Sequence, residues 1–255
     1  MSGMCRDAAW LASACEGQLV GLEGTERVSA PVVIDSRKVS DHGCFVAIVG
    51  ENVDGHDYAC AAYNSTTGLV IISSKDLDVP HIRVQDTVDA LGKIAYSYLR
   101  EIRQYREANG LPFDVAGVTG SVGKTTTKDL TRQIFASQGP TVAPQASFNN
   151  EIGLPLTILE ADNDTRYLLL EMGASGPGHI AYLTDIAPLD VAAVLMVGHA
   201  HMGGFGSVEA VARAKSEIIQ GLRSSGVAIL NADDPRTMAM AELAPGPVFS
   251  FSPSG

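Results

Sequence analysis

The fold of this 255-residue chain is decided by one stretch, Phe113-Asp-Val-Ala-Gly-Val-Thr-Gly-Ser-Val-Gly-Lys-Thr-Thr-Thr127. It begins as an apolar strand, Phe113–Val118, and continues through a glycine-rich loop into a helix that we expect to reach about Gln138. Glycines let backbone N–H groups approach phosphate oxygens, and the start of a helix favours negative charge. The order strand, loop, helix therefore predicts a phosphate-binding loop, and Gly-Lys-Thr followed by two further threonines favours ATP with Mg²⁺ over a dinucleotide.

The loop supplies most of the residues that we expect to hold the nucleotide. Lys124 can reach the β- and γ-phosphates, and the Thr125 hydroxyl can ligate Mg²⁺. The usual pattern places a glycine six residues before the lysine, where this chain has Val118. The predicted nucleotide-binding residues of the loop are Thr119, Gly120, Ser121, Val122, Gly123, Lys124, Thr125 and Thr126.

The rest of the second half alternates apolar runs with helical stretches. The further runs are Tyr167–Leu170, Val191–Val197 and Val227–Leu230. Such a pattern predicts an α/β domain with a mostly parallel sheet covered on both faces, which is a three-layer arrangement. Ligands collect at the carboxyl ends of such strands. The polar groups there are the Gly120 loop, Glu171, His201 and Asn231, which predicts a site at one rim of the sheet.

Four of the candidate polar residues have ordinary alternatives. Glu171 suits a Mg²⁺ site because that ion prefers oxygen ligands, although a solvated acid at a strand end would look the same. His201 could bind a metal or stabilise its loop by hydrogen bonds. Asn149 and Asn150 precede a predicted short helix, Ile152–Leu159, and their amides could be helix caps.

Lys215 is unusual because it faces the apolar side of a predicted helix, Ser207–Leu222. The apolar stripe consists of Val208, Val211, Ile218 and Leu222, while Glu209, Arg213, Ser216, Glu217 and Gln220 lie opposite. An inward lysine is costly unless it is paired, neutralised or modified. The alternative is a lysine whose stem packs inside while its charge reaches the rim.

The first segment, to about Asn109, mixes short strands with polar turns and predicts a small, separate α/β domain. The expected strands are Pro31–Ile34, Cys44–Val49, Leu69–Ile72 and His81–Val84, followed by a helix, Thr87–Arg106. The breaker-rich stretch 107–112 predicts domains 1–109 and 113–255, and the tail Pro245–Gly255 is expected to be irregular. Two donor-rich loops follow strands, one with Ser36 and Arg37 and one with Asp54, Gly55 and His56; ordinary turns would also explain them.

Composition narrows the function classes. With 29 acidic and 18 basic residues, the net charge of −11 disfavours nucleic acid and anionic membranes as partners. Four cysteines without a CxxC pair fit scattered thiols of a reducing compartment. We find no signal peptide and no apolar run of the ~18 residues that a membrane span needs, so we expect a cytoplasmic protein without membrane insertion.

Together these motifs resemble the Mur ligase family, ATP-dependent enzymes that add amino acids to the peptidoglycan precursor. The resemblance covers nearly the whole chain, and the family's loop normally departs from the general pattern at Val118. Three further stretches carry it: Asp54-Gly-His-Asp-Tyr58, Ser147-Phe-Asn-Asn-Glu-Ile-Gly-Leu-Pro155 and Glu171-Met-Gly-Ala174. They are similar to the members that join D-alanyl-D-alanine to UDP-N-acetylmuramoyl-tripeptide through an acyl phosphate.

The resemblance implies a role for each matching residue. Lys124 would hold the γ-phosphate, Thr125 and Glu171 one Mg²⁺, and His201 a second ion; Lys215 matches a lysine that is carbamylated in the family. Asn231 would lie near the adenine, and the first segment would be the uridine-nucleotide domain. The implied catalytic residues are Lys124, Asn150, His201 and Lys215, and the implied substrate-binding residues are Ser36, Arg37, Asp54, Gly55, His56 and Asn149.

The family usually has an asparagine where this chain has Met196, and its members have a third domain after the point where this chain stops. We therefore expect a truncated central domain and an incomplete, monomeric enzyme. The alternatives are a sister ligase that adds the third amino acid and a nucleotide-binding fragment without activity.

Overall fold

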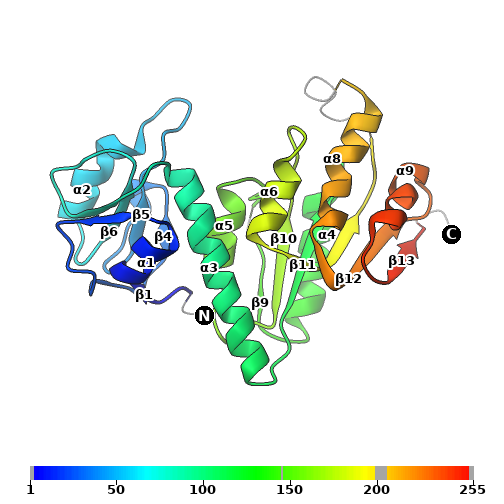
Figure 1. The fold of residues 1–255 in the computed structure, drawn as a ribbon, viewed down its shortest axis with the longest axis horizontal. Helices are drawn as coiled ribbons and strands as arrows, with labels where there is room; N and C mark the ends of the chain where they lie inside the picture. Colours follow the sequence, from blue (N-terminus) through cyan, green and yellow to red (C-terminus); the bar gives the residue numbers. More distant parts are fainter. Residues whose placement is uncertain (1–2, 145, 199–205, 253–255) are drawn as a thin grey trace. The chain divides into compact units, whose positions relative to one another are not determined.

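The structure, a computed structural model, describes residues 3–144, 146–198 and 206–252 (Figure 1). The chain forms two compact units. The first consists of Met1–Gln104 with Ile158–Asp164, and the second of Tyr105–Thr157 with Thr165–Gly255. The return of residues 158–164 to the first unit was not predicted from the sequence.

The first unit is built on a five-stranded mixed sheet with the order β2-β7-β6-β5-β4. β2 is antiparallel to its neighbour and the other pairs are parallel. The strands are β2 (Gln18–Val20), β4 (Val32–Val33), β5 (Cys44–Val46), β6 (Val70–Ser73) and β7 (His81–Arg83), and a separate pair consists of β1 (Arg6–Asp7) and β3 (Arg27–Val28). The helices are α1 (Ala8–Ala14), η1 (Ser36–Lys38), η2 (Gly55–Tyr58), α2 (Ala59–Asn64) and α3 (Thr87–Ala108).

Two apolar runs of the first unit form its core because both faces of their strands are covered. Phe45, Leu69 and Ile71 are completely or almost completely buried and pack against the alanines of α2. The four strands and the long helix expected here are present. Three of the strands are shorter than predicted, whereas β6 has the expected four residues and is shifted by one position.

The second unit contains a six-stranded sheet with the order β13-β12-β11-β8-β10-β9. Every described pair in it is parallel. The strands are β8 (Asp114–Thr119), β9 (Thr141–Val142), β10 (Tyr167–Glu171), β11 (Leu189–Val194), β12 (Leu222–Asn231) and β13 (Val248–Phe251). The helices are α4 (Lys124–Ala136), α5 (Gly153–Leu159), α6 (His179–Ile186), α8 (Val208–Gln220), α9 (Pro235–Met238) and η3 (Ala239–Leu243).

Helices lie on both faces of this sheet, with α6 and α8 on one side and α4 on the other (Figure 1). This confirms the predicted α/β class and the mostly parallel sheet. The continuous aliphatic runs explain it, since a parallel strand is buried on both faces. The prediction of an irregular tail was wrong: Val248–Phe251 adds β13 beside β12.

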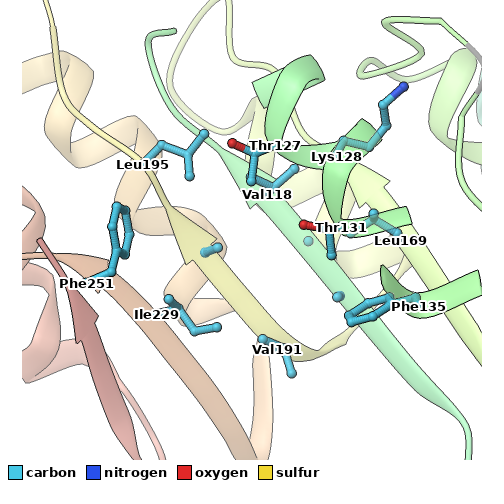
Figure 2. Close-up of a pocket in the computed structure, with 13 residues that line it drawn as sticks. Val118, Thr127, Lys128, Thr131, Phe135, Leu169, Val191, Leu195, Ile229 and Phe251 are labelled. Atoms are coloured by element: carbon cyan, nitrogen blue, oxygen red, sulfur yellow. The ribbon is translucent and has the colours of Figure 1, made fainter. Parts of the chain in front are cut away.

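The face of β11, β12 and β13 on the α4 side is less completely covered than the opposite face. Ala192, Val194, Ala228 and Leu230 are buried on the α8 side. On the α4 side, a cavity of about 370 Å³ is lined mainly by apolar side chains from α4 and five strands (Figure 2). Lys128 borders it with its methylene stem, and its nitrogen points away from the cavity (Figure 2).

The ends of the helices follow from local chemistry. The Ser207 hydroxyl accepts a hydrogen bond from the Ala210 amide and starts α8. The Asp234 carboxylate does the same for Arg236, and Pro235 occupies the first turn of α9. Among the described residues, no helix combines the length and apolar character that a membrane crossing requires.

Candidate active site

The glycine-rich loop connects β8 to α4 at the carboxyl end of the sheet. Gly123 has φ of +85°, a left-handed conformation that glycine adopts readily, and α4 begins directly after it. At Gly120 an added Cβ would lie 2.9 Å from the Leu195 Cβ, so the loop also needs a small residue there. The Lys124 ammonium donates a hydrogen bond to the Gly120 carbonyl at 2.9 Å, which folds the side chain back over the loop.

The loop is fixed to the segment that follows β11. The Ser121 amide donates to the Met196 carbonyl at 3.0 Å, and the Ser121 hydroxyl accepts from the Gly198 amide at 2.8 Å. Thr119 ends β8 and is buried, while Val122 and Thr126 are exposed. Met196, where the family usually has asparagine, therefore contributes its backbone to the loop's position.

Thr125 and Glu171 lie together, as predicted for a magnesium site. The Thr125 hydroxyl donates to the Glu171 carboxylate at 3.0 Å, although the two residues are 46 positions apart. Glu171 is 1% exposed, and its other carboxylate oxygen accepts a hydrogen bond from the Asn149 amide at 2.9 Å. A buried carboxylate oxygen beside a hydroxyl is the donor set that Mg²⁺ takes from a protein, with phosphates and water completing its shell.

The two asparagines have different roles in the structure. Asn149 contacts Glu171, and its carbonyl accepts a hydrogen bond from the Gly173 amide at 2.8 Å. Asn150 accepts from the Gly153 amide at 2.9 Å and so caps α5. The helix cap suggested by the sequence is thus present at Asn150, whereas Asn149 instead contacts the buried Glu171 carboxylate.

Lys215 is 5% exposed, in agreement with its position on the apolar stripe of α8. Burial and, to a lesser extent, the positive charge of Lys124 together lower the pKa of its ammonium to about 8. Within the described part of the chain, this ammonium forms no hydrogen bond or ion pair. It is therefore a buried amine with an unusually large neutral fraction near physiological pH.

Asn231 ends β12 at the same rim. Its side-chain amide donates to the Leu195 carbonyl at 2.8 Å, and its oxygen accepts from the Asp233 amide at 2.9 Å. Asp234, in the same loop, accepts from the Val197 amide at 2.7 Å. Three of the four predicted strand-end groups thus share one rim; the fourth, His201, lies outside the described residues.

In the first unit, the predicted substrate residues lie on two short 3-10 helices. Ser36 and Arg37 belong to η1, where the exposed Arg37 side chain pairs with Asp35 at 2.9 Å. This ion pair lowers the pKa of Asp35 to about 2. Gly55 begins η2, and an added Cβ there would lie 2.8 Å from the Ile48 carbonyl, so the turn requires glycine.

Asp54 and His56 interact with each other. The Asp54 carboxylate contacts the His56 ring nitrogen Nδ1 at 2.5 Å and pairs with Lys75. The hydrogen bond from Lys75 is the main reason why the pKa of Asp54 lies below its usual range. The buried His56 accepts a hydrogen bond from the Ser74 amide at 3.0 Å, so its ring holds two loops together.

Sequence reasoning missed two charged residues beside the site. Lys128 is completely buried on α4, one turn after Lys124. Glu217, predicted on the polar face of α8, accepts from the amides of Gly178 at 2.7 Å and Ala181 at 3.0 Å, and so caps α6. The spacing of four positions from Lys124 was an available signal for Lys128, whereas the sequence near Glu217 carries no local signal for its contact with α6.

The loop between a parallel strand and a helix, with a hydroxyl and a buried carboxylate beside it, defines a P-loop α/β protein. Residues 118–255 match the model of the Mur ligase middle domain. The chain belongs to the Mur ligase family.

Relatives of known name agree with this assignment. The chain is 40% identical over 253 residues to the UDP-N-acetylmuramoyl-tripeptide–D-alanyl-D-alanine ligase of Mycobacterium leprae, covering 89% of this chain and 48% of that protein. It is 37% identical to the ligase of the same name from Bacillus subtilis, covering 88% and 48%. The chain thus spans about half the length of the curated relatives it matches.

Solved structures show the same fold. A crystal structure of MurF from Acinetobacter baumannii superposes with a TM-score of 0.88 at 29% identity, covering 100% of this chain and 55% of that one. The MurF ligase of Thermotoga maritima, crystallised with ADP, gives a TM-score of 0.74 at 33% identity, covering 88% and 51%.

Proposed function

We propose that this chain is the nucleotide-binding and precursor-binding part of a ligase that joins D-alanyl-D-alanine to UDP-N-acetylmuramoyl-tripeptide with ATP. The observation that supports it most is the contact of Thr125 with Glu171 beside the phosphate loop. The relatives at 40% and 37% identity carry the name of that activity.

In this proposal the loop amides and the start of α4 bind the ATP phosphates. Lys124 exchanges the Gly120 carbonyl for the γ-phosphate. Thr125 and Glu171 hold Mg²⁺, with His201 at a second ion, and Asn231 lies near the adenine. Bound Mg²⁺ supplies charge neutralisation for the phosphates.

The reaction proceeds in two transfers. A carboxylate oxygen of the tripeptide attacks the γ-phosphorus of ATP, and ADP leaves as the acyl phosphate forms. The amine of D-alanyl-D-alanine then attacks the acyl carbon; phosphate leaves with the bond electrons, and the amine loses a proton. Alignment and charge stabilisation suffice for both transfers, and no protein nucleophile is required.

The residues of the first unit proposed to bind the precursor lie in its two loops and are Ser36, Arg37, Asp54, Gly55 and His56. Asn149 is the substrate-binding residue proposed for the second unit. Arg37 is suited to phosphate because its planar guanidinium presents paired donors. Asp54 and His56 already bond to each other, so their contribution would be to hold the loop in shape.

Lys215 is proposed to carry a carbamate. Its neutral amine attacks the carbon of CO₂, an N–C bond forms, and the nitrogen releases one proton, which leaves a carbamate anion. At a pKa of about 8 roughly a quarter of the amine is neutral at pH 7.5, against about 0.1% at the usual value. Bicarbonate should raise activity of the wild type and leave Lys215→Ala unchanged; equal activity with and without bicarbonate would contradict the modification.

A second candidate is nucleotide binding without turnover by these 255 residues alone. It is favoured by the coverage, since the relatives are about twice as long as the matched region.

The test is ATP turnover with UDP-N-acetylmuramoyl-tripeptide, with and without D-alanyl-D-alanine, on this chain and on a full-length version. Turnover by the full-length protein that requires the dipeptide supports the ligase. Acceptance of a different amine would keep the family and overturn the choice of substrate, as for a sister ligase that adds the third amino acid.

A further inference from the structure

Lys128 is a buried charge that the proposed reaction does not use. It is completely buried, and it lies on α4 one helical turn after the phosphate-binding Lys124. Charged side chains are seldom buried this fully without a partner that repays the loss of water. Its nitrogen points away from the apolar cavity that its stem borders, so the partner must be sought elsewhere (Figure 2).

The partner is the segment that follows β9. The Lys128 ammonium donates a hydrogen bond to the Pro144 carbonyl at 2.7 Å and pairs with the neighbouring Asp129 carboxylate at 2.8 Å. A hydrogen bond from a charged donor is shorter and stronger than a neutral one. The contact therefore fixes the start of the segment to the helix that carries the phosphate loop.

The same segment ends at the magnesium residues. Ser147 places its hydroxyl 3.3 Å from the Thr125 hydroxyl, and the Asn149 amide donates to Glu171 at 2.9 Å. Groups that hold a metal ligand in its orientation affect metal affinity although they never touch the ion. Lys128 acts less directly, because it fixes the backbone from which Ser147 and Asn149 extend toward the metal ligands.

We propose that Lys128 is a positioning residue for the Mg²⁺–nucleotide site, acting through its contact with Pro144 on residues 146–149. It clamps the segment to α4, so that Asn149 keeps the Glu171 carboxylate turned toward Thr125. The predicted change in Mg²⁺ dependence rests on the proposed function. The predicted effect of Lys128 on residues 146–149 rests on the geometry alone.

The test uses the 255-residue chain, a fluorescent ATP analogue and Mg²⁺ titrated from an EDTA-containing buffer. Lys128→Met keeps the length of the stem and removes the donor; about a tenfold higher Mg²⁺ concentration should be needed for half-maximal binding. Binding measured in EDTA should be unchanged. Lys128→Arg keeps a cationic donor and should restore most of the wild-type Mg²⁺ dependence.

Two further variants separate positioning from general stability. Arg132→Met removes an exposed cation from the next turn of α4 and should leave the Mg²⁺ dependence as in the wild type. Asn149→Ala should raise the Mg²⁺ requirement, and adding Lys128→Met to it should cause little further change, because both act on Glu171 by one route. Additive effects, or an equal loss of binding with and without Mg²⁺, would overturn the proposal.

Hydrogen exchange tests the role of Lys128 without nucleotide, and therefore independently of the proposed function. The amides of residues 146–150 should exchange faster in Lys128→Met than in Lys128→Arg, with no nucleotide present. If the wild type bound no nucleotide, the proposed function would be wrong. Exchange rates at residues 146–150 that were the same in Lys128→Met as in the wild type would refute the role of Lys128, whether or not the protein bound nucleotide. If Lys128→Met did not fold, Lys128→Arg with a raised Mg²⁺ requirement and unchanged exchange would refute it.

Discussion

Replacement of Lys215 by methionine is expected to stabilise the fold at neutral pH. The lysine is buried on α8, and among the described residues its ammonium has no hydrogen-bond or ion-pair partner. Methionine has a similar volume and an unbranched side chain, so it can fill the same space without the charge.

The magnitude follows from the pKa. Burial holds the pKa of Lys215 at about 8, against 10.5 for an exposed lysine. Each pKa unit corresponds to about 1.36 kcal/mol, so the difference of about 2.5 units disfavours the charged folded state by roughly 3 kcal/mol. Because the surroundings relax and the methionine packs imperfectly, we expect Lys215→Met to gain about 1–3 kcal/mol at pH 7.

The dependence on pH has a definite sign. Well below pH 8 the lysine is mostly protonated in both states, so nearly its full penalty applies. Between about pH 8 and 10.5 the unfolded chain binds a proton that the folded chain has released, and the free energy of unfolding rises with pH. Lys215→Met lacks this rise, so the advantage of the variant should shrink across that window.

The assay is urea unfolding from pH 7 to 10.5 in buffer free of carbon dioxide, so that no carbamate forms. Burial also raises the pKa of Cys15 to about 11, but this group is common to both proteins and cancels in the difference. Arg213→Met removes an exposed cation from the same helix and serves as the control. A constant difference between wild type and Lys215→Met from pH 7 to 10.5, or a less stable variant at pH 7, would refute the reasoning.

Three further changes test other contacts. Glu217→Ala leaves two amide donors at the start of α6 without their acceptor and should lower the free energy of unfolding by about 1–3 kcal/mol in a urea titration; Glu217→Gln should lose less. Gly123→Ala forces a side chain into the left-handed region of backbone conformation, so the free energy of unfolding should fall by about 1–2 kcal/mol in thermal unfolding and ATP binding should weaken. Unchanged ATP binding would show that the loop tolerates another conformation. The pKa of Asp54 is lower in the folded state than in the unfolded state, so its contribution to stability should be lost as pH falls below about 3.8. Asp54→Asn should therefore make acid unfolding less steep in that range. Parallel acid-unfolding curves of the wild type and the variant would argue against this contribution.

Much of the second unit could be predicted because its strands are buried on both faces. Such strands appear as continuous aliphatic runs, and a glycine-rich loop between one of them and a helix is typical of phosphate binding. The inward position of Lys215 followed from helical periodicity alone. The pairing of Thr125 with Glu171 was expected because parallel strands bring their carboxyl ends to one rim.

The parts that could not be predicted depend on contacts between distant segments. β13 was missed because it is an edge strand whose Phe249 is 61% exposed, in a region of turn-forming residues. On α4 the usual pattern is reversed: Lys128 is buried while Leu130 and Ile134 are 58% and 64% exposed. Glu217 was placed on the polar face because its amide partners on α6 lie 36 and 39 residues away.

The discontinuous first unit has a consequence for the order in which the protein folds during synthesis. The first unit is interrupted in the sequence after Gln104 and is completed only by Ile158–Asp164. In that last segment the Leu159 carbonyl accepts a hydrogen bond from the Met4 amide, and the Ala161 carbonyl accepts one from the Tyr98 hydroxyl. The interval from residue 104 to 164 is 60 residues. At about 5–20 residues per second, a ribosome needs roughly 3–12 s to supply it. During that interval the phosphate loop and α4 are synthesised. The first unit therefore cannot complete its fold until its last segment is available, by which time the second unit can begin to form.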